Sequence, residues 1–98
     1  MGSAIQIDHG TNQAVGVTAV PLYTCPIGVK KSIVKIRNNH ATNTIYIGGA
    51  NVSNSGNVQG LPILPNSADN FEFTSGTVIY VVASASPTSV SFIWSAGN

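Results

Sequence analysis

The stretch that decides the fold is residues 43–50, Asn-Thr-Ile-Tyr-Ile-Gly-Gly-Ala. Ile45 and Ile47 share one parity and predict a short strand with one buried face, because successive side chains of a strand point to opposite sides. The Gly48-Gly49 pair that follows can adopt positive φ and predicts a corner. The polar run at 51–60 predicts a flexible loop beyond that corner.

The same alternation of apolar and polar residues recurs on both sides of this stretch. The runs that carry it are 4–8, 13–20, 22–24, 31–38, 70–74, 77–84 and 89–95. The two prolines of residues 61–65 exclude a central strand and predict an extended segment along an edge. Pro21 likewise predicts an edge or a bend.

These runs predict an all-β protein. No window shows an apolar repeat of 3.6 residues, and β-branched residues dominate the runs. About seven or eight short strands separated by turn signals indicate a single antiparallel β-sandwich or barrel. A jelly-roll-like sandwich is the first choice. An immunoglobulin-like sandwich is second, because the Cys…Trp…Cys pattern of that fold is missing.

Several local features follow from the same patterns. Residues 9–13 predict a turn after the first strand, with Ile5 and Ile7 facing inward. Residues 31–48 predict a hairpin with a loop at 38–43. Strand 77–84 is apolar at both parities, so we expect both of its faces to be covered.

The side-chain faces of the other strands are also predicted. Val34 and Ile36 face the core, whereas Ile33 points outward with the basic residues of the same strand. Phe71 and Phe73 face inward. In the last strand the inward set is Val90, Phe92 and Trp94, and the outward set is Ser91, Ile93 and Ser95.

The composition points to a covered surface. Ninety-eight residues fit one domain, residues 1–98, in which Met1-Gly2-Ser3 fits a native start or a cloning remnant. Charged residues make up only 7% of the chain, against about 25% in an average protein. So few charges favour a surface covered by copies of the chain or by a larger assembly. The alternative is an extracellular β domain kept soluble by hydroxyl and amide groups.

Nothing in the sequence indicates catalysis, a cofactor or a metal. The single Cys25 excludes an intrachain disulfide and a cysteine metal cluster, and we expect it to be buried. Asp8, Asp69 and Glu72 are the only carboxylates, and their positions suit turns and a lysine partner better than an acid–base pair. His9 and His40 lack metal-ligand spacing. The chain has no signal peptide pattern and no run of ~18 apolar residues that would cross a membrane.

The basic residues form a candidate partner-contact set, Lys30, Lys31, Lys35 and Arg37. They are all the Lys and Arg residues of the chain, and three of them share one face of one strand. Such a face could bind an acidic protein surface or could simply be a solvated face that prevents edge aggregation. Nucleic acid is a poorer partner, because the net charge is only +1 and no aromatic residues interleave the basic ones.

Two further surfaces are candidates. The outward residues of strand 77–84, Val78, Tyr80 and Val82, predict an oligomer face. Tyr46 with the loop residues Asn51, Asn54 and Asn57 is a candidate ligand site, for example for a carbohydrate. Trp94 could add to that site, but its alternation with Val90 and Phe92 places it in the core.

Short motifs connect these features to a known group of proteins. They are Ile36-Arg37-Asn38, residues 45–49, Leu64-Pro65 and residues 79–81, with Val52 and Phe71 between them. In this respect the chain resembles small all-β virion proteins of tailed bacteriophages, of the capsid decoration (cement) or head-fibre-base type.

That resemblance implies a non-enzymatic homo-oligomer, a trimer or a dimer. It would be made in the bacterial host cytoplasm and would sit on the capsid surface, bound to the major capsid protein or another virion protein. The alternative is a carbohydrate- or receptor-binding module of a phage tail or head fibre. Neither reading involves nucleic acid, a membrane or a cofactor.

Overall fold

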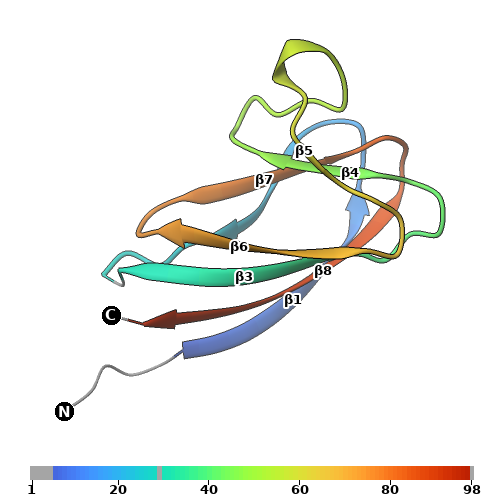
Figure 1. Ribbon diagram of the computed structural model, residues 1–98. Coiled ribbons are helices and arrows are strands. Elements are labelled where there is room, and N and C mark those ends of the chain that lie inside the picture. The colour runs from blue at the N-terminus through green and yellow to red at the C-terminus, as the bar shows by residue number, and fades with distance from the viewer. Residues whose placement is uncertain (1–5, 29, 98) are drawn as a thin grey trace.

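The protein is an antiparallel β-sandwich of two four-stranded sheets (Figure 1). The computed structural model describes residues 6–28 and 30–97, and of residues 6–8, 11–14, 96 and 97 it describes the backbone alone. The predicted all-β class and the sandwich are confirmed. The inward placement of Ile5 and Ile7 lies outside the described residues and side chains.

Sheet A has the strand order β1-β8-β3-β6 and sheet B the order β2-β7-β4-β5. Sheet A consists of β1 (Gln6–Val15), β8 (Thr88–Gly97), β3 (Lys31–Asn38) and β6 (Ala68–Thr74). Sheet B consists of β2 (Val20–Thr24), β7 (Val78–Ala83), β4 (Ile45–Gly48) and β5 (Leu61–Ile63). Within the described ranges the only helix is the 3-10 turn η1 (Gly56–Val58), and no helix there could span a bilayer.

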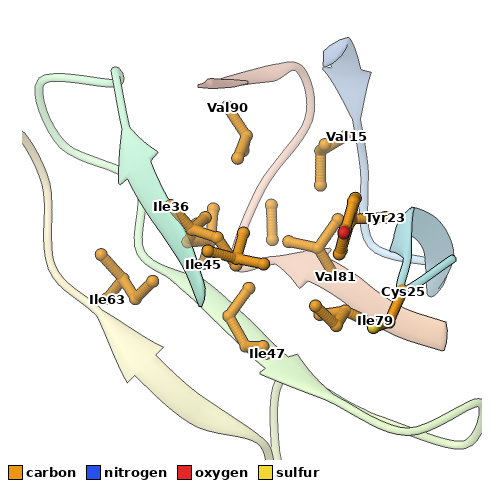
Figure 2. Close-up of a cluster of buried hydrophobic side chains, with 12 residues drawn as sticks. Val15, Tyr23, Cys25, Ile36, Ile45, Ile47, Ile63, Ile79, Val81 and Val90 are labelled. Carbon is orange, nitrogen blue, oxygen red and sulfur yellow. The ribbon is translucent and has the colours of Figure 1, made fainter. Parts of the chain in front are cut away.

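The predicted faces of the strands are confirmed. In β3 every second side chain is fully buried, including Val34 and Ile36, while Ile33 is exposed. Ile45 and Ile47 of β4 are buried, and Phe92 and Trp94 of β8 pack against the core. The core between the sheets (Figure 2) consists of Val15, Tyr23, Cys25, Val34, Ile36, Ile45, Ile47, Ile63, Ile79, Val81, Ala83 and Val90. Full burial of one such aliphatic side chain contributes about 1.5–3 kcal/mol.

The prolines mark the edges of sheet B, as predicted. Pro21 lies in β2 and Pro62 in β5, and these are the two outer strands of the sheet. A proline has no N–H to give to a neighbouring strand, so an outer strand tolerates it where a central strand would not. In β2 the pairing register with β7 shifts between Pro21 and Tyr23.

The predicted turn at residues 9–13 is wrong, because β1 runs through it as one ten-residue strand. The predicted strand at 13–20 is instead split between β1 and β2. Gly10 has a packing role: a Cβ built there would lie 2.7 Å from Cζ of Phe92 on the neighbouring strand. A glycine inside a strand marks such a close approach as readily as a turn.

The predicted hairpin at 31–48 is also wrong, because β3 belongs to sheet A and β4 to sheet B. The chain between them crosses from one sheet to the other. His40 holds this crossing, since its Nδ1 accepts hydrogen bonds from the backbone N–H groups of Thr42 and Asn43, at 3.0 and 2.9 Å. A polar loop of this length can join two strands of the same sheet or two strands of different sheets. The loop sequence does not distinguish these two connections.

One expectation about the corner after β4 is wrong. Neither Gly48 nor Gly49 has positive φ; among residues 6–28 and 30–97 the glycines that do are Gly28, Gly56 and Gly76. Gly48 is needed for space, because a Cβ there would lie 2.8 Å from Cγ2 of Val52.

The run at 51–60, which we call the tip loop, folds back on itself and contains the 3-10 turn η1 (Figure 1). Val52 is buried, and backbone bonds from Ser53 N to Val58 O (2.9 Å) and from Gly60 N to Ser53 O (3.1 Å) close the loop on itself. The polar composition of the tip loop gives little sign of this fold, because only one of its side chains, Val52, is buried as an apolar anchor.

Candidate functional site

The fold separates charge between the two sheets. All four strands of sheet B, and the tip loop beside them, are free of Asp, Glu, Lys and Arg. The acidic and basic residues lie on β1, β3 and β6 of sheet A, or at Lys30 directly before β3. A partner guided by charge would therefore meet the protein on sheet A.

The outer face of sheet A presents three of the four basic residues. Lys31, Lys35 and Arg37 are exposed on β3, whereas Lys30 is exposed outside the strand. Lys31 Nζ lies 3.3 Å from Oε2 of Glu72, the one ion pair among the described side chains. Both partners are 59% exposed, so this pair adds at most about 1 kcal/mol to stability. The face keeps a net positive charge.

Two isoleucines give this face an apolar centre. Ile33 is 49% exposed and Ile93, on the adjacent β8, is 45% exposed. Lys35 pairs directly with Ile93 across the two strands, and a shallow depression lies on either side of this pair, of about 190 and 380 Å³. We define the outer face of sheet A by Lys31, Ile33, Lys35, Arg37 and Ile93. Apolar contact at the centre with charges around it is the usual anatomy of a protein-docking surface.

The predicted oligomer residues have different environments. Val82 is 1% exposed, and the tip loop is anchored to the same strand by a hydrogen bond from Asn54 Nδ2 to the carbonyl of Ala83 (3.0 Å). Val82 therefore cannot contact another chain in this conformation. Val78 and Tyr80 are partly exposed, and for them the oligomer face stays a prediction.

The predicted ligand residues of the tip region differ in exposure, and for them the ligand site stays a prediction. Asn51 and Asn57 are exposed, but Asn54 is used in the bond to Ala83. Tyr46 is half-buried on β4. Trp94 packs with its ring centroid 5.3 Å from that of Tyr23, on the core side of sheet A.

The described residues offer no arrangement for acid–base or metal chemistry. Asp69 pairs with Ile36 and Glu72 with Ile33, so the two carboxylates leave β6 on opposite faces. No group of three His, Cys, Asp or Glu residues converges within the described part of the chain.

A buried polar cluster joins β2, β3 and the turn after β2. The Tyr23 hydroxyl donates to Oγ of Ser32 at 2.8 Å, and the Cys25 thiol lies 3.1 Å from the same oxygen. Burial raises the pKa of the Tyr23 hydroxyl above its ordinary value of 10.0, and the bond to Ser32 opposes that rise in part. All three polar groups have partners inside the core, so the cluster stabilises the fold and exposes no nucleophile.

The raised pKa of Tyr23 predicts a loss of stability in alkali. Below pH 10 the Tyr23 hydroxyl is neutral in both the folded and the unfolded protein. Above pH 10 the hydroxyl ionises first in the unfolded chain, because its pKa is raised only in the folded protein. The contribution of Tyr23 to the unfolding free energy therefore falls as pH rises toward the folded pKa. We expect Tyr23→Phe to show a shallower fall in unfolding free energy than the wild type between about pH 9 and 11. Urea unfolding at several pH values measures both slopes. Equal slopes would contradict this account.

Comparison with known proteins supports the fold. No family model and no curated protein sequence matches the chain. Among solved structures, a protein of the Bacillus endospore appendages, a family of disulfide-linked pili, superposes with a TM-score of 0.62 at 15% identity, covering 97% of this chain and 88% of that chain. A chain of the cyanophage Pam1 capsid asymmetric unit superposes with a TM-score of 0.53 at 13% identity, covering 98% and 86%. This chain therefore shares its β-sandwich with a pilus protein and a phage capsid chain.

Proposed function

We propose that the protein is a non-enzymatic structural protein of a phage virion, a decoration protein that binds the capsid surface and stabilises the head. The observation that carries the proposal is the outer face of sheet A, with three cations around two exposed isoleucines. Its partner would be an acidic surface with an apolar patch, on the major capsid protein or another virion protein. The protein would be made in the host cytoplasm and act as a homo-oligomer.

The fold supports this proposal without deciding it, because one fold serves many functions. The capsid chain of cyanophage Pam1 has a similar sandwich over nearly the whole length of this chain. The two sheets, of strand order β1-β8-β3-β6 and β2-β7-β4-β5, also fit the jelly-roll-like arrangement expected from the sequence, which recurs in viral capsid domains.

Cys25 favours a virion role over a role in a disulfide-linked pilus. It is the one cysteine of the sequence, and it is fully buried between the sheets. A disulfide to another chain needs an accessible thiol. The carbohydrate-binding alternative is weaker as well, because Trp94 faces the core and Asn54 is committed to holding the tip loop.

Reversing charge on the outer face of sheet A should weaken docking. We expect the double variant Lys35→Glu/Arg37→Glu to bind cognate capsids, stripped of accessory proteins, at least ~10-fold more weakly than the wild type. Binding by the wild type should also weaken as salt is raised, because the attraction is screened. Co-sedimentation with capsids measures binding, and the melting temperature of the capsids measures stabilisation.

The matched control is the triple variant Lys30→Glu/Ser55→Glu/Ala85→Glu, which changes the net charge by the same amount at exposed positions outside the outer face of sheet A. This control should retain most of the binding. Equal loss of binding in the double variant and in this control would indicate a general charge effect, and absence of wild-type binding to capsids would reject the proposal.

A further inference from the structure

An apolar groove opens at the end of the sandwich where β4 stops and β7 begins. Its volume is about 310 Å³, and it lies between the facing side chains of Phe71 and Phe73 from β6 and those of sheet B, including Leu61 and Val78. The two phenylalanine rings are stacked with centroids 5.9 Å apart and are only partly buried. Gly48 and Gly49 form part of the wall, and a Cβ built at Gly49 would meet no atom within 4 Å.

The lining of the groove selects an apolar occupant. No charged side chain lines it, and Thr77 is its one polar side chain. A small molecule normally needs a few placed polar groups to fix its orientation, which these walls do not supply. An aliphatic side chain carried on another polypeptide needs only the apolar walls.

The most exposed large apolar side chain of the described chain lies at the same end of the molecule. Ile27 is 89% exposed in the turn after β2. This turn is fixed to the β6–β7 turn: Gly28 N donates to Ser75 Oγ (3.3 Å), Ser75 Oγ donates to Pro26 O (3.3 Å), and Gly76 N donates to Cys25 O (3.0 Å). Ile27 is thus held outward on a braced turn next to the strands that form the groove.

We infer that the groove and Ile27 form one self-association patch, in which Ile27 of each copy enters the groove of a second copy. Because the protruding side chain and the groove share one end of the molecule, a two-fold axis between two copies can satisfy both contacts at once. The inference assigns a surface to the homo-oligomer of the proposed function. It replaces the buried Val82 with residues that are open to a partner.

Charge favours a second copy as the occupant. The outer face of sheet A carries uncompensated cations, so two copies meeting through that face would repel each other. The walls of the groove carry no charge, and of the two cations nearest that end, Lys30 and Lys31, the second is paired with Glu72. Two copies meeting there would therefore set fewer uncompensated cations against each other than through the outer face of sheet A. The patch is small beside the ~800 Å² per partner of a standard interface, so we expect association in the micromolar range or weaker.

Three lysine substitutions test the pairing, and all change the net charge by the same amount. Ile27→Lys alters the protruding residue and Leu61→Lys, at a side chain 51% exposed, alters the groove. Ile33→Lys, at a side chain 49% exposed on the outer face of sheet A, is the matched control. Sedimentation velocity of the free protein from about 1 to 500 μM gives the dissociation constant.

We expect the wild type and Ile33→Lys to dimerise, and both patch variants to raise the dissociation constant at least ~100-fold, because each dimer contains two altered contacts. A monomeric wild type over this range, dimers of both patch variants, or equal dissociation of Ile33→Lys would overturn the inference. Melting temperatures confirm that each variant is folded. Capsid binding is not part of this measurement. A failure of the self-association inference can therefore be told apart from a failure of the docking proposal.

Discussion

Replacing Asn38 with alanine is expected to lower the free energy of unfolding by about 4 kcal/mol. Asn38 ends β3 and its side chain is fully buried. Its Nδ2 donates to the carbonyls of Asn43 (2.7 Å) and Ile63 (3.1 Å), and its Oδ1 accepts from the backbone N–H of His40 (3.0 Å). One side chain therefore ties β3 of sheet A to the crossing loop and to β5 of sheet B.

The size of the effect follows from what alanine would leave behind. Each backbone group deprived of its partner in the interior costs about 1–3 kcal/mol, and a cavity adds to that loss. A loss of about 4 kcal/mol is a large part of the ~5–15 kcal/mol that stabilises a typical domain. For a chain of this size it corresponds to a fall in melting temperature of roughly 20 °C.

Asn39→Ala is the control for Asn38→Ala. Asn39 is exposed and donates to Oγ of Ser91 at 2.6 Å, so its loss should change stability by no more than about 1 kcal/mol. Chemical denaturation of both variants measures the difference. Similar losses in the two proteins would show that Asn38 does not have the bridging role given to it here.

Replacing Gly60 with alanine is expected to cost about 3 kcal/mol. A Cβ at Gly60 would lie 2.5 Å from Cγ2 of Val52 and 2.6 Å from the carbonyl oxygen of Ile47. The oxygen belongs to the backbone of β4, so it cannot move aside as a flexible side chain would. Either β5 shifts away from β4 or Val52 leaves its buried position, and the tip loop loses its anchor.

Gly49→Ala is the matched control for Gly60→Ala. Gly49 has open space where its Cβ would lie, and its φ is not positive. The substitution should leave stability unchanged or raise it by up to about 1 kcal/mol through the unfolded state. Hydrogen exchange should show faster opening of residues 51–63 in Gly60→Ala only. Unchanged protection there would refute the packing argument.

Much of the outer face of sheet A, the proposed docking surface, could be predicted from the sequence. The alternation in residues 31–38 placed Lys31, Lys35 and Arg37 on one face and Val34 and Ile36 on the other, because the direction of a strand side chain depends only on its parity. The structure adds Ile93, since the contact between Lys35 and Ile93 requires β8 to pair with β3. The sequence did not lead us to predict the groove or the exposed Ile27 beside it. The residues that could have suggested them are Ile27 in the Pro26–Gly28 turn and the pair Gly48-Gly49.

The sequence by itself determined the properties that depend on neighbouring residues: the all-β class, the strands from residue 31 onward with their buried faces, and the edge positions of Pro21 and Pro62. Only the tertiary structure decided which strands pair, that β3 and β4 lie in different sheets, and that Gly10 accommodates Phe92. It also decided that Asn38 is buried. The physical reason is range: alternation and ring constraints act within a few residues, whereas pairing and close packing join residues that are distant in the chain.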